Sequence, residues 1–375
     1  MDRYSVQRIF NRHLDELKKE TSFPLYIHKA LSAIGSCRTA ALGGHSQYCE
    51  QGHLNGVWYN SCKHRACPQC RSMPTEEWLK HTQAFLLNCP HHHIVFTIPS
   101  EFHIFWRYNR ALMTDILFKA VRDTLKKFSN NPQYLNATPG ILSALHTWGR
   151  DLCLHPHLHV LVSHGGLSKS GEWVVPRKKH LFPQKPTMMI FRGKFLAAMR
   201  EALNNSLLKL PPDSRENKVR TLLNRLGRKE WVVYYSDRYD HPRGVANYLS
   251  RYVKGGPFKN SQLKYVSDDK VTFQYKSHKT EKIECMTLSP KDFMRRILQH
   301  VPLPGKPTVR YGGLYVPSCR ERLNLARSVF GQGEVKERDY LDWVSYLEER
   351  ACRPVCKECG HPLFHREEVA RVKRG

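Results

Sequence analysis

Apolar residues recur every three or four positions at the start of the chain, which is the spacing of one face of an α-helix. Val6, Ile9, Phe10 and Leu14 carry this pattern. A second, shorter helix is predicted over Leu25–Ile34. Because we see no catalytic chemistry in residues 1–36, we interpret them as a helical cap or docking segment.

The middle of the chain changes to the β-branched and alternating pattern of strands. One strand is predicted over His93–Pro99, where the proline ends it. A helix over residues 108–128 follows. Two further strands, Ile141–Gly149 and His155–Val162, are joined by a linker short enough for a hairpin.

The second half of the chain alternates between helices and short strands. The pattern predicts helices over 191–207, 215–227 and 243–254 and strands over 231–235, 263–266 and 270–275. This mixture of helices and closely connected strands predicts an α+β fold with an antiparallel sheet. No apolar run approaches the roughly 20 residues that a membrane-spanning helix needs, so we expect no transmembrane segment.

Charge then narrows the choice of partner. The chain has 60 Lys and Arg against 33 Asp and Glu, a formal net charge of +27. Such an excess favours a polyanion, with nucleic acid first and an acidic membrane surface second. The first residues carry charges with no apolar stretch behind them, so we expect a cytoplasmic protein whose thiols are reduced.

Cysteine and histidine crowd one short segment. Residues 37–70 contain five cysteines and three histidines in 34 positions. Such density, with few apolar residues to form a core, predicts a structural zinc ion that supplies folding free energy. We expect a tetrahedral set of Cys49, His53, Cys67 and Cys70, with Cys62 and His64 competing for one position and Cys37 with His45 as part of a second site.

A second pair of cysteines lies near the end of the chain. Cys356 and Cys359 have the Cys-x-x-Cys spacing of half a zinc site. The nearby candidates for the other half are Cys352, His361 and His365. A second zinc ion there is left open by the sequence.

Three histidines alternate along one predicted strand, so His155, His157 and His159 share a face. Histidine pairs of this kind bind metal, here Mg²⁺ or Mn²⁺. One known pattern is that of histidine-triad nucleotide hydrolases, although Pro156 replaces an apolar residue of that pattern. The other is the metal site of rolling-circle single-strand endonucleases, which uses His157, His159 and a third ligand. We prefer His146 as that ligand, because a hairpin would place it beside the pair, and His155 is its rival.

Two tyrosines lie one turn apart on the predicted helix 243–254. Tyr248 and Tyr252 share a face with Val245, Leu249 and Val253. Alone, the pair fits simple packing. Beside a metal that polarises a DNA phosphate, either phenol is a candidate nucleophile for a covalent phosphotyrosine. We lean towards Tyr252 as the first nucleophile, because Arg251 and Lys254 are its neighbours and could favour the phenolate or hold DNA.

Taken together, these motifs resemble the two-tyrosine HUH-type rolling-circle transposases of bacterial insertion sequences, which carry an N-terminal zinc-binding domain. The matching segments are Cys37–His45, Asn60–Cys62, Cys67–Cys70, Leu145–Gly149, His155–His159, Tyr248–Tyr252, Phe293–Arg296 with His300–Val301, and Val309–Leu314. The resemblance implies an antiparallel-sheet HUH endonuclease core preceded by a small zinc-binding domain. It also implies single-stranded DNA at transposon ends and target DNA as partners, 5′-phosphotyrosine intermediates and a place at the bacterial nucleoid.

On this basis we divide the chain into four parts. They are a helical segment (1–36), a zinc-binding domain (37–85), a catalytic domain (90–280) and a basic helical region with a possible zinc knuckle (281–375). Expected phosphate contacts are Arg177, Lys178, Lys179, Arg192, Lys194, Arg251, Lys254, Arg295 and Arg296. A plasmid relaxase or replication initiator would share the chemistry, whereas a zinc-finger regulator would bind DNA without cutting it.

Overall fold

The structure, a computed structural model, describes residues 4–70, 72–176, 181–236, 238–240, 244, 256–277, 280–335 and 354–372. Its helices are α1 (Val6–Glu20), α2 (Leu25–Ser36), α3 (Ser72–Phe85), α4 (His103–Tyr108), α5 (Arg110–Ser129), α6 (Gln184–Asn204), α7 (Glu216–Arg228), α9 (Pro290–Leu298) and α10 (Arg320–Val329). Among them, none is both long and apolar enough to cross a bilayer.

The strands group into separate antiparallel sheets. They are β1 (Gly44–Cys49), β2 (Leu54–Tyr59), β3 (His91–Thr97), β4 (Gly140–Trp148), β5 (Leu154–Ser163), β6 (Gly166–Leu167), β7 (Trp173–Val174), β8 (Val233–Tyr235), β9 (Leu263–Val266), β10 (Val271–Lys276), β11 (Ile283–Leu288), β12 (Val309–Gly313) and β13 (Leu363–Val369).

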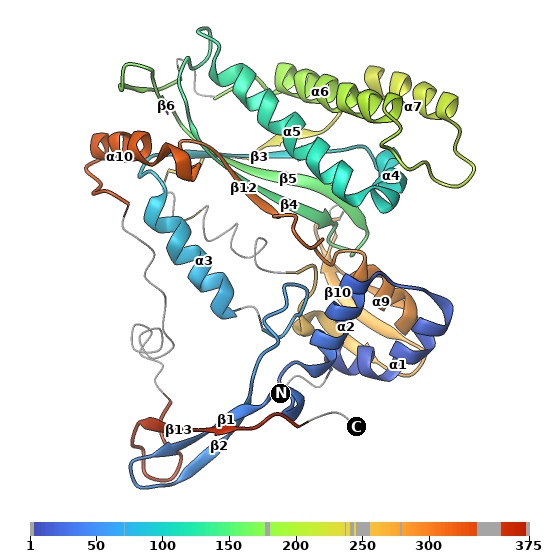
Figure 1. Ribbon diagram of the computed structural model, residues 1–375, viewed down its shortest axis with the longest axis vertical. Helices are drawn as coiled ribbons and strands as arrows, with labels where there is room; N and C mark the ends of the chain where they lie inside the picture. The colour runs from blue at the N-terminus through green and yellow to red at the C-terminus, as the bar shows by residue number, and fades with distance from the viewer. Residues whose placement is uncertain are drawn as a thin grey trace.

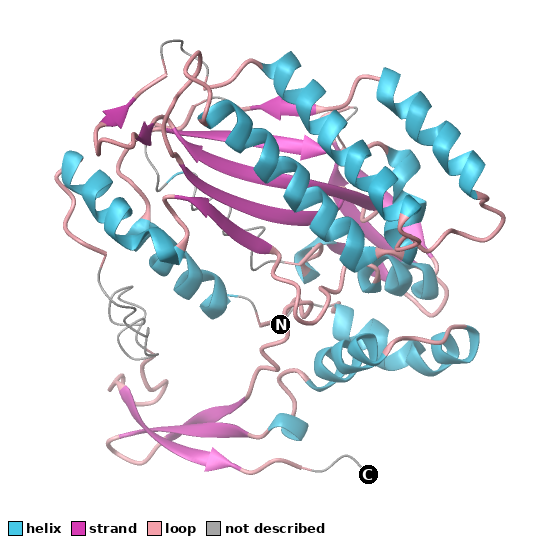
Figure 2. Ribbon diagram, turned by 45° about the horizontal axis from the view of Figure 1, so that its top comes forward, coloured by secondary structure: helices cyan, strands magenta, loops and turns pink. Residues whose placement is uncertain are grey.

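The largest sheet has the strand order β12-β4-β5-β3-β8. Helices α4, α5, α6 and α7 cover one of its faces, as Figures 1 and 2 show. Phe96, Leu158 and Val160 point into that interface, where they pack with helix residues such as Leu117 and Phe191. The alternation of the strands sends their other side chains to the opposite face.

The opposite face is only partly covered by apolar helices. Leu142, Ala144 and Leu161 pack there with Trp78 of α3 and Leu323 of α10. The remainder of this face, at the far end of β4 and β5, carries histidines instead of apolar residues. It is therefore the sheet face on which polar chemistry can take place.

A second core joins the first helices to residues 258–301 below the main sheet (Figure 1). It consists of α1, α2 and α9 packed on the sheet β11-β10-β9. Its centre includes Phe10 and Ile34 from the first helices and Phe273 and Phe293 from the later segments. Helices α1 and α2, which lie in the first 36 residues, thus pack against residues 258–301.

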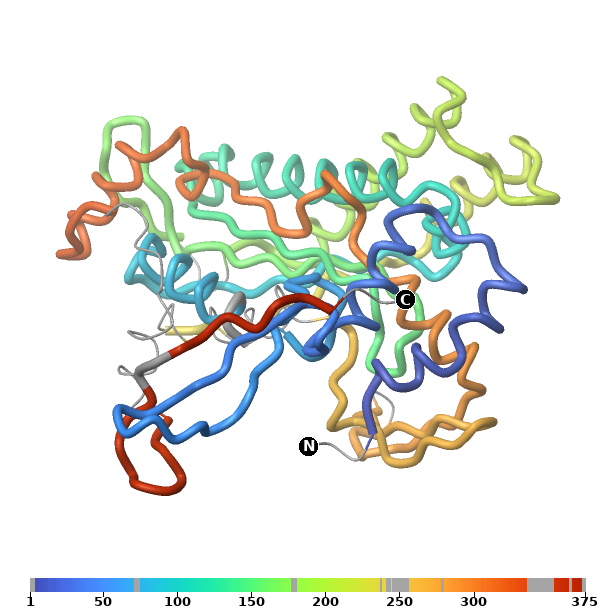
Figure 3. Tube along the Cα trace, turned by 60° about the horizontal axis from the view of Figure 1, so that its bottom comes forward, coloured from blue at the N-terminus to red at the C-terminus, as the bar shows by residue number. Residues whose placement is uncertain are grey.

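A three-stranded ribbon in the order β13-β1-β2 extends away from both cores. Figure 3 shows the C-terminal strand beside the strands of the first sixty residues. The register runs from Gly44 opposite Val369 to Cys49 opposite Leu363. The two ends of the chain are therefore paired directly.

Most of the predicted elements are present, including the hairpin of β4 and β5. Strands β1, β2, β6, β7, β11, β12 and β13 were not predicted. The described residues after 280 form both helices and strands, and β12 among them forms an edge strand of the main sheet. Strands β2, β11 and β12 are short and largely half-buried or exposed, so their apolar pattern is weak. The predicted helix 243–254 lies outside the described residues.

Candidate metal centres

The β4–β5 hairpin assembles a cluster of three histidines. Its register places His146 directly opposite His157, and His159 lies two residues further along the same face. One ring nitrogen from each lies within 4.8 Å of those of the other two. All three are buried, with exposed fractions of 2%, 9% and 8% in the order of their numbers. The expectation that a hairpin brings His146 to the pair is confirmed.

Hydrogen bonds orient two of these rings. His157 Nδ1 lies 2.6 Å from the His155 carbonyl oxygen, to which it donates, so Nε2 of His157 keeps its lone pair. His159 Nδ1 lies 2.8 Å from Nε2 of His93 on the neighbouring strand β3. The Nε2 atoms of His157 and His159 face each other at 3.0 Å. This arrangement matches metal-binding histidines, whose second nitrogen is held by a carbonyl or another acceptor.

Burial also sets the charge of this cluster. Desolvation holds the pKa of both His146 and His159 well below its usual range, and the neighbouring histidines lower it further. Burial likewise lowers the pKa of His93 to about 4. The rings of His146, His159 and His93 are therefore neutral near pH 7. A neutral imidazole is the form that donates a lone pair to a divalent cation. His155, the rival third ligand, is not part of the cluster.

Four cysteines form a second cluster within the second core. Cys37, Cys62, Cys67 and Cys70 place their sulfurs within 4.8 Å of one another. Hydrogen bonding with the neighbouring cysteines raises the pKa of Cys62 and of Cys67, and the backbone N–H groups of His64 and Gln69 offset part of that rise. Tetrahedral thiolate sets of this composition hold structural zinc, so these residues fit the ion.

The third cluster joins distant parts of the chain. Cys49 and His53 of the ribbon meet Cys356 and Cys359, again with ligand atoms within 4.8 Å. The Cys49 and Cys359 sulfurs are 3.6 Å apart, and Cys356 Sγ is 3.8 Å from His53 Nδ1. The backbone N–H groups of Cys359 and Glu358 lower the pKa of Cys356 to about 6. A thiolate stabilised in this way is a ready zinc ligand.

The expected tetrahedral set is thus divided between two clusters. Cys67 and Cys70 belong to the four-cysteine cluster, whereas Cys49 and His53 complete the half-site at the end of the chain. Of the two candidates for one zinc position, Cys62 belongs to the four-cysteine cluster and His64 does not. His64 Nδ1 instead accepts a hydrogen bond from the Ala66 N–H. Cys37 and His45 do not form a site, since the His45 ring stacks on Trp58. Ribbon pairing, absent from the sequence analysis, is the physical reason for the regrouping.

Comparison with known proteins agrees with this geometry. Residues 140–322 match the family described as "Putative transposase", and residues 9–98 match the "Transposase zinc-binding domain". "Putative transposase y4qJ" of Sinorhizobium fredii is 32% identical over 371 residues, which cover 94% of this chain and 93% of the relative. The chain belongs to the IS91-type family of two-tyrosine transposases.

A second relative of this transposase extends the comparison. "Transposase for insertion sequence element IS801" of Pseudomonas savastanoi pv. phaseolicola is 32% identical over 309 residues, covering 78% of this chain and 72% of the relative. No solved structure matches the chain. The histidine cluster lies within residues 140–322, the segment that matches the "Putative transposase" family. The segment that matches the zinc-binding domain ends at residue 98, long before Cys356 and Cys359.

The remaining predicted site residues of the transposase either lie outside the described residues or contact other parts of the protein. Tyr248, Tyr252, Arg251, Lys254 and Arg177–Lys179 lie outside the described residues. Arg295 pairs with Glu20 and Asp292, and Arg296 donates to the Asp151 carbonyl and to two sulfur atoms. Arg192 donates to the Lys229 carbonyl. These intramolecular partners give Arg295 and Arg296 structural roles, and their contact with DNA stays a prediction.

Sequence reasoning missed two residues of the metal centres. Cys37 was given a different partner, although its place in the cysteine-rich segment was a usable signal. His93 was treated only as part of a strand. His93 is the last of three consecutive histidines, His91 to His93. Consecutive histidines carry no spacing pattern that would mark one of them as a neighbour of a metal ligand rather than a buried polar residue. Its role appears only when β3 pairs with β5 and brings it to His159.

Proposed function

We propose that this transposase nicks single-stranded DNA at the ends of its element through a tyrosine nucleophile and then rejoins the strands. The observation that carries the proposal is the buried cluster of His146, His157 and His159 on the main sheet of a transposase-family chain. A divalent cation held there, Mg²⁺ or Mn²⁺, would polarise the phosphate and offset charge in the transition state. The two tyrosines of the motif Tyr248–Tyr252 supply the nucleophiles.

The covalent step balances without a cofactor that is consumed. A tyrosine Oη attacks the phosphorus, an Oη–P bond forms, and the bond from phosphorus to the 3′ oxygen breaks. The tyrosine proton passes to solvent, and the 3′ oxygen leaves as a hydroxyl after taking up a proton. Because the phosphotyrosine keeps a phosphodiester linkage, a 3′ hydroxyl of another strand can displace the tyrosine and close a new bond without ATP.

The neighbouring residues prepare the site for this step. The His155 carbonyl and the His93 ring hold the imidazoles of His157 and His159 in position. Holding ligands in advance avoids reorganisation during the reaction. In our proposal Tyr252 makes the first cut and Tyr248, one helical turn away, accepts a second strand.

The test is a search for a covalent adduct. The full chain is incubated with single-stranded DNA of an element end and Mn²⁺, and the products are separated on a denaturing gel. We expect an adduct with the native chain and with Tyr248→Phe, and none with Tyr252→Phe or the double variant. Removing only the hydroxyl keeps ring packing, so a lost adduct reports chemistry and not folding.

Two further variants test the metal centre. His157→Ala and His159→Ala should abolish the adduct while binding of DNA persists. A covalent adduct from the double phenylalanine variant would contradict the assignment of the nucleophiles. Cleavage of a plasmid transfer or replication origin in preference to an element end would favour a relaxase or initiator over a transposase.

A further inference from the structure

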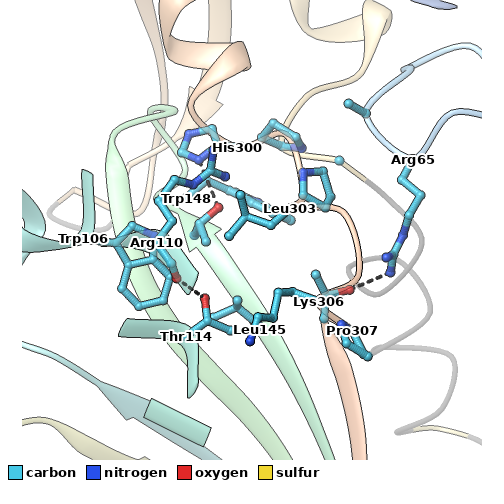
Figure 4. A pocket seen from close by; sticks show the side chains of 16 residues that line it. Arg65, Trp106, Arg110, Thr114, Leu145, Trp148, His300, Leu303, Lys306 and Pro307 are labelled. Atoms are coloured by element: carbon cyan, nitrogen blue, oxygen red, sulfur yellow. Dashed lines mark hydrogen bonds between the residues drawn. The ribbon is translucent and has the colours of Figure 1, made fainter. Parts of the chain in front are cut away.

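A cleft of about 730 Å³ opens beside the four-cysteine cluster. One wall is the loop Lys63–Arg65, which lies between two of the cluster's cysteines. The other walls are α2, α3 and the proline-rich segment 302–308 that leads into β12. We call it the knuckle cleft. It continues past Arg65 into the smaller pocket shown in Figure 4, which shares Arg65 and residues from Pro302 to Thr308.

The described residues that line the knuckle cleft carry positive charge and no negative charge. Lys29, Lys63 and Arg65 line it, and within the described parts of the chain no acidic residue does. Lys306 also lines it but is partly neutralised by Asp115, 2.5 Å away. In the adjoining pocket Arg110 binds the Tyr26 hydroxyl and the Val301 carbonyl rather than a carboxylate. Such a cleft attracts a chain of phosphates.

Aromatic side chains line the cleft together with these cations. Tyr26, Trp78 and Tyr311 line the cleft, and Trp106 and Trp148 line the adjoining pocket. Aromatic rings inside a cationic groove are the features that bind single-stranded nucleic acid, because unstacked bases stack on the rings. A duplex, whose bases are already stacked inside it, cannot use them in this way.

The four-cysteine cluster fixes the cationic wall. Lys63 has a φ of +53°, in the left-handed region that a lysine rarely adopts. It directly follows Cys62, so a metal bound by that cysteine would hold this strained turn in place. Arg65 Nη2 donates to Thr308 Oγ1 across the cleft at 2.7 Å, as the dashed line in Figure 4 shows.

The position of the cleft connects it to the histidine cluster. Trp78 and Tyr311 belong to the apolar group that packs on the same sheet face as the three histidines. Trp148, which lines the adjoining pocket, stacks on His146 with ring centroids 5.0 Å apart. A strand of nucleic acid in the cleft would therefore lie beside the metal centre.

We propose that the knuckle cleft binds the single-stranded DNA that flanks the reacting phosphate, with the loop of the four-cysteine cluster as one wall. The identity of the strand as DNA rests on the proposed function. The location of the site rests on the charges and rings of the cleft alone. A metal in the four-cysteine cluster then acts on DNA affinity without touching the catalytic centre.

The first test removes charge from the wall. Lys63→Gln with Arg65→Gln removes both charges while keeping unbranched polar side chains, and both changes are made in the Tyr248→Phe, Tyr252→Phe background so that binding is measured without cleavage. Affinity for a fluorescent oligothymidylate is measured against salt by anisotropy. Loss of two phosphate contacts should reduce the slope of log affinity against log salt by about 1.4. The matched control is Lys218→Gln with Arg220→Gln on the exposed face of α7, which should leave the slope unchanged.

A second readout locates the strand directly. Oligonucleotides that carry 5-iododeoxyuridine are photo-crosslinked to the same background variant, and the adducts are mapped by mass spectrometry. We expect crosslinks to Tyr26, Trp78 or Tyr311, and Tyr311→Leu should weaken binding at least about fivefold through lost stacking. Duplex of the same sequence should compete poorly.

Failure of the cleft and failure of the proposed chemistry give different results. An unchanged salt slope with crosslinks confined to other surfaces would overturn the cleft, even if the native chain forms its tyrosine adduct. Equal competition by duplex would overturn the single-strand assignment. A native chain that forms no adduct but shows the expected slope and crosslinks would overturn the chemistry and retain the cleft. The variants' zinc content, equal to that of the background, shows that they have folded.

Discussion

The hydrogen bond that His159 Nδ1 donates to His93 Nε2 decides which nitrogen of His159 faces the metal centre. With its Nδ1 held by His93 at 2.8 Å, His159 offers Nε2 to the cluster. His93 is itself buried, and burial lowers its pKa to about 4, so it acts as a neutral partner near pH 7. Partners of this kind commonly contribute about 10- to 100-fold to metal affinity.

We therefore expect His93→Ala to weaken Mn²⁺ binding by about tenfold or more, since the His159 ring loses its fixed orientation. Titration calorimetry with zinc-loaded protein measures this without any reaction. The adjacent His92→Ala is the control, because His92 binds His164 rather than a cluster residue. Equal Mn²⁺ affinity in the His93 variant and the native chain would show that His93 does not position the ligand.

Among the secondary-structure elements, the β4–β5 hairpin was the most predictable. Both strands are rich in apolar residues and are joined by a short turn, so their pairing and the meeting of His146 with His157 follow from local sequence. The contribution of β3 could not be foreseen, because its register with β5 depends on packing of the whole sheet. Tyr248 and Tyr252 remain predictions at this scale.

The turn of this hairpin is held from outside by α9. Arg296 Nη1 donates to the Asp151 carbonyl at 3.0 Å and also contacts Met286. Because Arg296 donates to groups of the protein itself, Arg296→Gln should lower the free energy of unfolding by about 1.5–3 kcal/mol, the usual value for a hydrogen bond to a charged group. Urea denaturation followed by circular dichroism measures the change.

The same variant separates the structural role of Arg296 from its predicted contact with DNA. Its slope of log DNA affinity against log salt should equal that of the native chain, whereas a phosphate contact would reduce the slope by about 0.7. Lys119→Gln on the exposed face of α5 serves as a control for stability. A stable Arg296→Gln protein with a reduced slope would return Arg296 to the DNA-binding surface.

Across the whole molecule, the two ends of the chain are joined at one metal cluster. Cys49 and His53 lie near the start, and Cys356 and Cys359 lie near the end, with β13 paired to β1 beside them. Sequence reasoning searched for the missing half of each site among close neighbours, where zinc ligands usually lie. A pairing across some three hundred positions leaves no spacing signal, which is why the two clusters were regrouped only by the structure.

This architecture predicts two structural zinc ions that can be removed one at a time. Cys356→Ser with Cys359→Ser should reduce the zinc content from two to one per chain, measured by mass spectrometry of the metal. The remaining attachment of residues 363–369 is then the strand pairing with β1 alone. Local opening of a segment held by fewer contacts increases its cleavage by protease, so limited proteolysis should release the C-terminal strand while both helical cores stay intact.

Two comparisons make that result specific to the joint between the chain ends. Cys153→Ser with Cys285→Ser removes two exposed thiols outside the clusters and should leave both zinc ions and the protease pattern unchanged. Cys62→Ser with Cys67→Ser should also remove one zinc ion, but it disturbs the core in which Cys67 is buried and should lower the melting temperature more. A zinc content that stays at two after the change at Cys356 and Cys359 would contradict a metal link between the ends, and the ribbon would then be held by its backbone pairing alone.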